Sequence, residues 1–305
     1  MRSKVIVITG PTAGGKTALS LQLATRYNGE IINADASQIR RDLEIGTAKI
    51  DWRNQKIKHH LFDLLGPEDP FSIRDYQKMA RNLIKNLTLC GKIPFFVGGS
   101  GLYINAALGN YDLSIPGRSP LFDRQFDHLG NEDLHKILTK EDPLAAAVIH
   151  VNNRRRVLRA ISAARAGKKI SENLKGRDAL YQSLILCLIC DREILYSRIN
   201  ERVDLMFDQG WVEEVQTLIE KGVNLQNIKE IGYREIALYL AGEMSLSDVK
   251  TLIKTKTRRY SKRQSTWFRN QMDCTYLPVD FADFQTTVRN AEVIVDGFLG
   301  RDNKE

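Results

Sequence analysis

Long apolar runs are missing from this chain of 305 residues, in which no stretch approaches the ~20 apolar residues of a membrane-spanning helix. The first apolar strand begins at Val5, so we expect no signal peptide. Cysteine is also scarce, with four residues, of which Cys187 and Cys190 form a C-x-x-C pair. On a strand these two face opposite sides, which disfavours a shared disulfide or metal. We therefore expect a cytoplasmic protein with buried, reduced thiols.

Acidic residues are absent from two segments, 151–171 and 252–271. Each segment carries seven Lys or Arg residues, so together they exceed the net charge of +8, and the rest of the chain is net acidic. The second segment also contains Tyr260, Trp267 and Phe268. Cations interleaved with stacking rings suit a polyanion that presents bases as well as phosphates, so the sequence predicts an RNA partner. A solvated helix face is the alternative for either run alone.

A complete phosphate-binding loop follows the apolar residues 5–8, and it reads Gly10-Pro11-Thr12-Ala13-Gly14-Gly15-Lys16-Thr17. Glycines let consecutive N–H groups turn toward a polyphosphate, and the following helix points its positive end at the same place. Lys16 can reach the terminal phosphates, and the Thr17 hydroxyl suits Mg²⁺. The loop predicts binding of a di- or triphosphate. It leaves open whether that phosphate belongs to a nucleotide.

Strand and helix patterns alternate through the first hundred residues. We predict strands over 5–9, 30–34, 59–64 and 92–97, and helices over 16–27, over 72–89 with Ser72 as N-cap, and from 102. The expected fold is α/β, with a P-loop NTPase-like parallel sheet as its core. Ligands of such sheets bind at the carboxyl ends of the strands, so the phosphate loop, Asp35 and residues 98–101 are expected at one edge.

The pattern changes near residue 112. A connector at 114–120 leads into short helical segments, and the sheet resumes over 181–190. We expect a catalytic core made of residues 1–111 and 176–305, mostly helical after 190, and a helical insertion at 112–175.

A carboxylate is missing after the strand at 93–97, where kinases and ATPases usually hold magnesium through water. Asp35 is instead the carboxylate beside the phosphate loop. It is a candidate base or orienting acceptor, kept ionised by Lys16 or magnesium, with a helix N-cap as the alternative. Arg234 begins a helix after a glycine and is a candidate second cation for the phosphates.

With these motifs in place, the chain resembles the tRNA dimethylallyltransferases, also called tRNA isopentenyltransferases. The matching blocks include the phosphate loop, Asn33-Ala34-Asp35, Ile45-Gly46-Thr47-Ala48-Lys49, His59-His60-Leu61, Val97-Gly98-Gly99-Ser100-Gly101, Arg202-Val203-Asp204, Ile231-Gly232-Tyr233-Arg234-Glu235 and Ser261-Lys262-Arg263-Gln264. The chain lacks the C-terminal Cys/His zinc module of eukaryotic members, so it resembles the bacterial type. The resemblance implies transfer of a dimethylallyl group from dimethylallyl diphosphate to N6 of an adenosine. That adenosine lies 3′ to the anticodon, at tRNA position 37, in tRNAs that read codons beginning with U.

The resemblance also implies roles for individual residues. The phosphate loop binds the diphosphate, while Lys16, Thr17 with Mg²⁺, and Arg234 neutralise the leaving group. Asp35 accepts a hydrogen bond from N6 and removes its proton. The residues implied to contact tRNA are Asp35, Ala36, Ser37, Gln38, Ser100, Arg124, Arg155, Arg156, Val157, Leu158, Arg159, Lys262 and Arg263. We expect a monomer.

The sequence departs from the family pattern at several positions. Ala36 stands where Ser is usual, Gly14 where Ser is typical, and Ser100 where Thr is typical. The stretches Arg40-Arg41-Asp42 and Val151-Asn152-Asn153 also differ. Three alternatives stay open: a prenyltransferase of free adenine nucleotides, a small-molecule kinase, and an RNA-binding homologue that has lost catalysis.

Overall fold

The computed structural model describes residues 2–110, 113, 119–173 and 179–301. The chain forms two compact units, one from Met1–Leu108 with Tyr181–Glu305 and the other from Gly109–Leu180. The boundaries expected near 112 and 175, and most of the connector at 114–120, lie outside the described residues.

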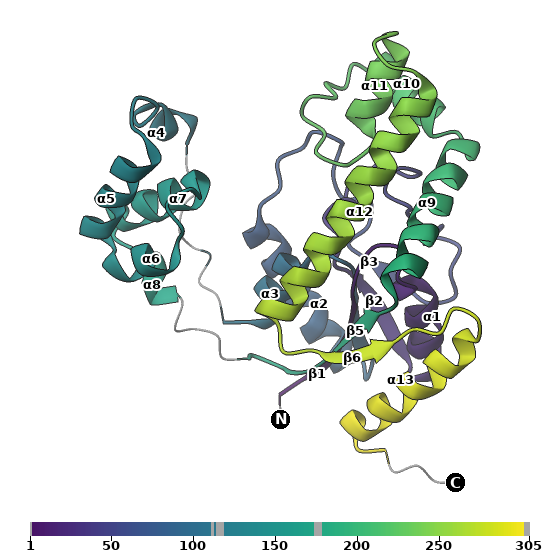
Figure 1. Cartoon of the computed structure of the whole chain (residues 1–305). Helices are drawn as coiled ribbons and strands as arrows, with labels where there is room; N and C mark the ends of the chain where they lie inside the picture. The colour runs from purple at the N-terminus through teal and green to yellow at the C-terminus, as the bar shows by residue number, and fades with distance from the viewer. Residues whose placement is uncertain (1, 111–112, 114–118, 174–178, 302–305) are drawn as a thin grey trace. The chain divides into compact units, whose positions relative to one another are not determined.

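The first unit is built on a six-stranded parallel sheet with the strand order β3-β2-β4-β1-β5-β6 (Figure 1). Its strands are β1 (Lys4–Thr9), β2 (Gly29–Asn33), β3 (His59–His60), β4 (Ile93–Val97), β5 (Gln182–Ile189) and β6 (Thr275–Pro278). The expected parallel α/β core is confirmed. Strand β3 is shorter than predicted because Leu61 and Asp63 adopt positive φ angles of 64° and 52°, which turn the chain out of the sheet. Strand β6 was not predicted, because one of its four residues, Leu277, is buried and the sequence therefore shows no apolar run there.

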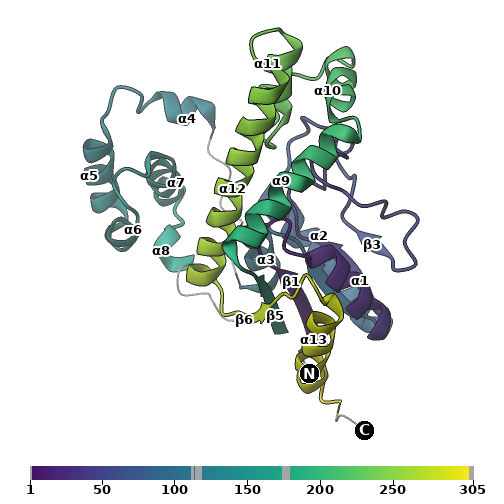
Figure 2. The same cartoon turned by 45° about the vertical axis from the view of Figure 1, so that its right-hand side comes forward.

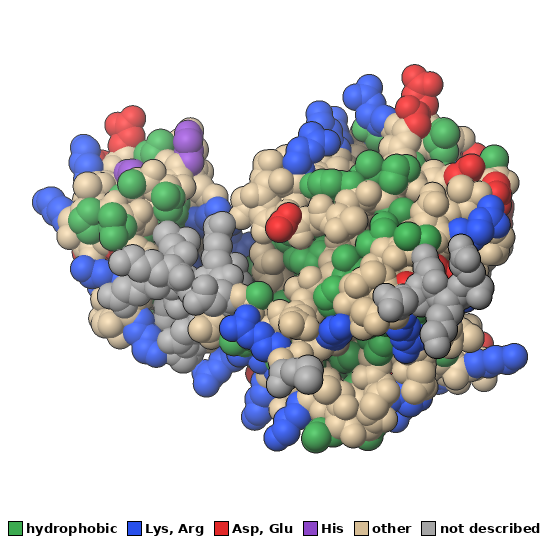
Figure 3. All heavy atoms as spheres, turned by 90° about the horizontal axis from the view of Figure 1, so that it is seen from below, with side chains coloured by type: hydrophobic (Ala, Val, Ile, Leu, Met, Phe, Trp, Pro, Cys, Tyr) green, Lys and Arg blue, Asp and Glu red, His purple; other side chains and the backbone are tan. Residues whose placement is uncertain are grey.

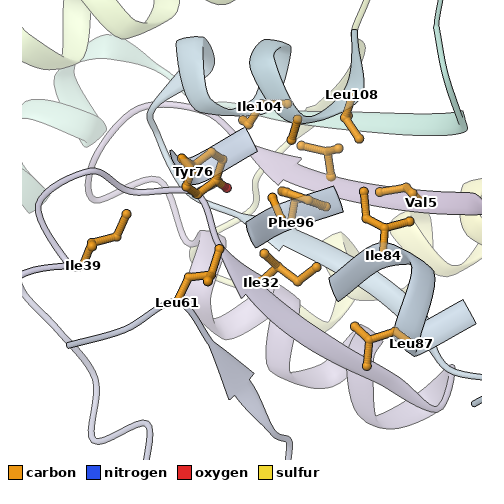
Figure 4. Close-up of a cluster of buried hydrophobic side chains, with 14 of the residues drawn as sticks. Val5, Ile32, Ile39, Leu61, Tyr76, Ile84, Leu87, Phe96, Ile104 and Leu108 are labelled. Carbon is orange, nitrogen blue, oxygen red and sulfur yellow. The ribbon is translucent and has the colours of Figure 1, made fainter. Parts of the chain in front are cut away.

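Helices cover both faces of this sheet. Alternate side chains of β1 point to opposite faces. Val5 and Val7 pack beneath α2 (Ile73–Leu89) and α3 (Gly101–Leu108), in the cluster shown in Figure 4. Ile6 and Ile8 pack beneath α1 (Lys16–Arg26) and α13 (Phe284–Leu299). The predicted N-cap of α2 is confirmed, because the Ser72 hydroxyl accepts a hydrogen bond from the N–H of Asp75.

A lobe of four further helices belongs to the same unit. It comprises α9 (Arg192–Asp208), α10 (Trp211–Glu220), α11 (Tyr233–Leu240) and α12 (Leu246–Gln271). Trp211 and Tyr233 lie in its apolar core. Helices α9 and α12 lie side by side, and α12 runs from this lobe down to the sheet (Figures 1 and 2).

Apart from one isolated β-bridge between Gly109 and Ala179, the regular elements described in the second unit are helices. Its helices are α4 (Pro120–Arg124), α5 (Asn131–Glu141), α6 (Pro143–Val148), α7 (Arg154–Arg165) and α8 (Ile170–Asn173). Leu134, Leu138 and Ile161 are among its core residues. Lys and Arg side chains reach the surface of both units on the face shown in Figure 3. Among the described residues of the chain, no helix is long and apolar enough to cross a bilayer.

Helix α12 docks onto the sheet where the chain lacks side chains. A Cβ atom on Gly99 would lie 2.0 Å from the Gln264 amide nitrogen, and one on Gly101 would lie 1.9 Å from the Trp267 ring. A Cβ atom on Gly98 would lie 2.2 Å from the Ala34 backbone. The glycine-rich stretch after β4 is therefore a seat for α12 rather than an open anion-binding turn.

We expect Gly101→Ala to lower the free energy of unfolding by roughly 1–3 kcal/mol, because its Cβ must displace the Trp267 ring. The matched control is Gly297→Ala in α13, where nothing lies within 4 Å of the added Cβ. There the substitution should be neutral or stabilising by about 0.5–1 kcal/mol, since alanine favours helix more than glycine does. Urea unfolding of both variants measures the difference. Equal stability of the two proteins would contradict this account of α12 docking.

Candidate active site

The phosphate loop connects β1 to α1, and its conformation depends on glycine at two points. Gly10 has a φ of 131°, and a Cβ there would lie 2.7 Å from the Leu188 carbonyl oxygen. Gly15 has a φ of 88° and directly precedes α1. The first N–H groups of α1 have no acceptor within the helix, and they open toward the cavity that the loop lines. The loop and the helix end together form an anion site.

Lys16 lies at the centre of this loop. Its Nζ donates hydrogen bonds to the carbonyl oxygens of Gly10 (3.1 Å) and Pro11 (2.7 Å). Burial lowers the pKa of Lys16 to about 8, an effect that the nearby charge of Asp35 partly opposes. A bound phosphate would supply the anion that the buried ammonium group needs.

Asp35 is held in place by its neighbours rather than by a cation. The Asn33 side chain is fully buried, accepts a hydrogen bond from the Asp35 N–H (2.9 Å), and donates to the Asp35 carbonyl (3.1 Å) and the Leu61 carbonyl (2.9 Å). One carboxylate oxygen, Oδ1, accepts from the Ser37 N–H at 3.0 Å. Residues 36–39 form turns, so Asp35 does not cap a helix. The carboxylate lines the site from the carboxyl end of β2.

Two arginines of α9 lie over the phosphate loop. Arg198 Nε donates to the Ala13 carbonyl (3.2 Å), and Arg202 Nη1 lies 3.4 Å from the Thr12 hydroxyl. Burial lowers the pKa of Arg202, and the charge of Asp35 opposes that shift. These cations come from a helix to which the sequence analysis assigned no site residue. Arg202 did stand in a block shared with the family, and that was the available signal.

The structure does not bring Arg234 to the loop. Its guanidinium donates to the carbonyl oxygens of Ile228 (2.8 Å) and Gln226 (2.6 Å), and it lines neither cavity of the site. It braces the turn before α11. Arg198 and Arg202, rather than Arg234, are the arginines that contact the phosphate loop.

Gln264 of α12 ties the phosphate loop to the glycine-rich stretch after β4. Its Oε1 accepts from the Thr12 N–H at 2.9 Å, and its Nε2 donates to the Gly99 carbonyl at 3.1 Å. Tyr260, about one helical turn earlier, lines the site near Asp35. Burial and the Asp35 charge raise the pKa of the Tyr260 phenol, so it stays a neutral hydrogen-bonding group.

Two cavities adjoin at Asp35. The phosphate cavity, about 600 Å³, is lined by the phosphate loop, Arg198 and Arg202. The second cavity, about 500 Å³, is lined by Asp35, Ala36, Ser37 and a wall of apolar side chains. Six residues line both, namely Thr12, Asp35, Thr47, Arg202, Met206 and Tyr260. A molecule bound at the loop can therefore meet a second molecule beside Asp35.

A side chain of α10 holds the loop that carries Thr47. The Glu214 carboxylate accepts hydrogen bonds from the N–H groups of Glu44 (2.9 Å), Ile45 (2.7 Å) and Gly46 (3.2 Å). Gln38 Nε2 donates to the Thr47 carbonyl at 3.1 Å. The wall formed by this loop is thus set by backbone hydrogen bonds.

A buried ion pair secures the same loop at its far end. The Lys49 ammonium, with a fully buried side chain, pairs with Asp63, which also accepts from the Trp52 indole N–H (3.0 Å). Burial would raise the pKa of Asp63, but the hydrogen bonds from Lys49 and Trp52 outweigh it and lower the pKa. The pair keeps the loop closed against β3.

The remaining residues implied to contact tRNA divide between the two units. In the first, the Ser100 hydroxyl accepts from the Ala36 N–H (3.0 Å), Arg263 lines the second cavity and Lys262 is exposed on α12.

In the second unit, Arg124, Arg155 and Arg156 are exposed. Val157 and Leu158 instead belong to the core of the unit, with exposed fractions of 0% and 5%, so their side chains do not present a surface to RNA. Arg159 is half-buried.

The chemistry of the donor set suits a metal held jointly with a ligand. Among the described residues, no group of three or more His, Cys, Asp or Glu side chains could hold a metal ion. Thr17 lines the phosphate cavity at the start of α1. Mg²⁺ commonly binds with one or two protein oxygens and completes its shell with water and phosphate oxygens. The Thr17 hydroxyl with a bound diphosphate fits that habit.

Comparisons with known proteins agree on one family. A family model described as IPP transferase matches residues 38–271. The chain is 44% identical over 292 residues to a protein of Bacillus subtilis named tRNA dimethylallyltransferase, which covers 92% of this chain and 93% of that protein. It is 45% identical over 277 residues to a protein of the same name from Anoxybacillus flavithermus, with 89% of each chain covered.

Solved structures give the same answer. A tRNA delta(2)-isopentenylpyrophosphate transferase from Staphylococcus epidermidis is 37% identical with a TM-score of 0.73, covering 97% of this chain and 99% of that one. A eukaryotic dimethylallyltransferase acting on tRNA is 28% identical with a TM-score of 0.85, covering 99% of this chain and 81% of that one.

The pKa of Lys16 predicts how anion binding depends on pH. A diphosphate at Nζ raises a pKa that is about 8 in the free protein, so binding takes up a proton above that pH. We expect affinity for inorganic diphosphate to be full below pH 8 and to fall by up to about tenfold per pH unit above it. Calorimetric titrations in a pH series measure this.

The control is Lys16→Arg, which stays charged throughout and reports the ligand's own titration. The wild-type affinity should fall with pH more steeply than that of the variant. Parallel profiles for the two proteins would show that Lys16 does not titrate in this range.

Proposed function

The chain belongs to the IPP transferase family, and from this premise we propose that it is a tRNA dimethylallyltransferase. It transfers the dimethylallyl group of dimethylallyl diphosphate to N6 of the adenosine at tRNA position 37, next to the anticodon. The acceptors are tRNAs that read codons beginning with U, and the products are N6-isopentenyladenosine and diphosphate. The observation that supports this most directly is the position of Asp35, where a phosphate cavity adjoins a second cavity.

The phosphate cavity supplies the electrostatic part of the reaction. As N6 attacks C1 of the donor, the C1–O bond breaks and its electron pair leaves with the diphosphate. The N–H groups at the start of α1, Lys16 and Arg202 surround the place where that charge grows. Donors fixed in advance around a developing charge stabilise the transition state more than the ground state. Bound Mg²⁺, held by the Thr17 hydroxyl and the diphosphate, would add further neutralisation of the leaving group.

Asp35 supplies the base. The N6 amine is a weak nucleophile because its lone pair is delocalised into the adenine ring. A carboxylate that accepts a hydrogen bond from N6 directs that lone pair at C1 and takes the proton as the new bond forms. Asn33 holds the backbone of Asp35 and the Ser37 N–H donates to Oδ1, and together these contacts fix the orientation of Asp35. Among the described residues, no hydrogen bond engages Oδ2. Oδ2 is then the oxygen that faces the substrate.

The adenosine must leave the stack of the anticodon loop to reach Asp35, which costs a few kcal/mol. Basic residues that hold the RNA offset this cost. On α12 the exposed cations are Arg259, Lys262, Arg263 and Arg269. The others make contacts within the protein: Lys250 lies over the Phe207 ring, Lys254 contacts Asp204, Lys256 contacts Glu235 and Arg258 contacts Asn200. In the second unit, the exposed Arg155 and Arg156 of α7 are further candidates for RNA contact. We place the enzyme in the cytoplasm as a monomer.

Asp35→Asn tests the assignment of the base. The variant keeps the shape and the acceptor for the Ser37 N–H but loses the charge, so turnover should fall by about 10²–10⁴-fold. The assay combines the protein, Mg²⁺, dimethylallyl diphosphate and an unmodified anticodon stem-loop with consecutive adenosines. Mass spectrometry then follows the gain of one C5H8 unit.

Asp42→Asn is the matched control, because Asp42 is an exposed carboxylate of the next turn that pairs with Lys221 at 3.0 Å and lines neither cavity. It should keep full activity. RNA affinity and its salt dependence should be unchanged in both variants. A wild-type protein that binds the stem-loop but never adds mass would overturn the proposed function in favour of RNA binding alone.

A comparison of Arg202 and Arg234 decides which cation serves the diphosphate. Arg202→Ala removes a buried charge over the phosphate loop, and we expect kcat to fall by about 10²–10³-fold, as for loss of one donor to a developing charge. Arg234→Ala removes two hydrogen bonds to the turn at 226–228 and should lower thermal stability while leaving kcat in the folded protein near wild type. Steady-state kinetics on both variants test this. The reverse ranking of kcat would restore Arg234 to the site.

A further inference from the structure

Helix α9 presents two different faces to the two cavities. Arg198, Glu201, Arg202 and Leu205 line the phosphate cavity. Ile199, Val203 and Met206, spaced at i, i+4 and i+7, line the second cavity as a single apolar stripe. One helix therefore offers charge to a diphosphate and hydrocarbon to something beside it.

The donor's hydrocarbon has to run along that stripe. In the proposed reaction the diphosphate lies at the phosphate loop and C1 lies beside Asp35. The remaining carbons of the donor therefore extend from C1 at the place where the two cavities adjoin. Of the six residues that line both cavities, Met206 has the one wholly apolar side chain. Val203 of the stripe and Trp211 of α10 line the second cavity with it, and all three are buried, with exposed fractions of 2% for Val203, 8% for Met206 and 2% for Trp211.

The Trp211 side chain, which lines the second cavity, is held firmly in place. Its indole lies against two glycines, and a Cβ on Gly46 or Gly232 would come within 2.3 Å or 2.0 Å of the ring. Phe207 and Tyr233 flank it, with ring centroids at 5.5 Å and 6.0 Å. A ring seated on backbone and braced by other rings is a rigid wall, since close-packed interiors yield little to an extra methylene.

We propose that Met206 and Trp211 set the length of the prenyl donor. They admit a five-carbon allylic diphosphate and exclude the ten-carbon geranyl diphosphate, whose added isoprene unit would meet the indole. This inference rests on the proposed function and adds to it the residues that choose the donor. Both residues are specificity determinants, and neither takes part in the bond-making step.

The test measures kcat/KM for geranyl and dimethylallyl diphosphates in the wild type, Met206→Ala and Trp211→Leu. Shortening either side chain should raise the geranyl to dimethylallyl ratio by roughly tenfold or more, since each accommodated methylene is worth about 1–3 kcal/mol of discrimination. Met244→Ala is the matched control, because Met244 packs on the same apolar core but lines neither cavity. Its ratio should equal that of the wild type. Among the described residues the Trp211 N–H has no hydrogen-bond partner, so leucine removes no such bond.

The outcomes separate the two proposals. If the wild type transfers dimethylallyl but the folded Met206 and Trp211 variants keep its donor ratio, the length selection is overturned and the proposed function stands. If the wild type transfers no dimethylallyl group, both are overturned. Should the variants not fold, competition in the wild type decides. Geranyl diphosphate should compete with dimethylallyl diphosphate at least about tenfold more weakly than inorganic diphosphate does, and equal or stronger competition would overturn the inference.

Discussion

The side-chain amide of Gln264 joins the parts of this protein that must act together. Its oxygen holds the Thr12 N–H of the phosphate loop, and its nitrogen holds the Gly99 carbonyl after β4. The same helix, α12, reaches α9 through Lys254 and Arg258, and α9 carries the arginines that lie over the loop. Because residues 99 and 101 are glycines, Gln264 and Trp267 of α12 pack directly against the backbone there. Helix α12, with its exposed cations, is therefore tied directly to the phosphate loop.

Asp35, the proposed base, is likewise positioned by backbone and neutral groups. Asn33 and Ser37 orient Asp35 through hydrogen bonds. The charge of Asp35 opposes the lowering of the pKa values of Lys16 and Arg202 by burial, but neither cation forms an ion pair with Asp35. In the proposed reaction the base is therefore oriented by hydrogen bonds and not by an ion pair.

Much of this arrangement could be predicted from local sequence, and the rest depends on contacts between distant segments. The phosphate loop, the parallel order of strands and the place of Asp35 follow from patterns within a few residues, and the structure has them. Arg234 looked like a phosphate ligand because it begins a helix after a glycine, but carbonyls at 226 and 228 occupy it. Arg198 and Arg202 reach the loop from about 185 residues away in sequence, which no local pattern reports. Strand β6 escaped prediction because an edge strand with one buried residue has no apolar run to reveal it.

The contacts made within α12 change what its composition means for RNA. The segment 252–271 carries seven positive charges and no acid, yet Lys254, Lys256 and Arg258 already have polar partners on other helices. Lys254 and Lys256 are paired with carboxylates, whereas the partner of Arg258 is a neutral amide. An RNA strand releases condensed counterions only for phosphates that a protein cation newly neutralises, so this segment counts as about five charges rather than seven. The fold thus sets how steeply the affinity for RNA falls as the salt concentration rises. Some positive side chains that the composition offers to RNA are already paired with carboxylates of the folded protein.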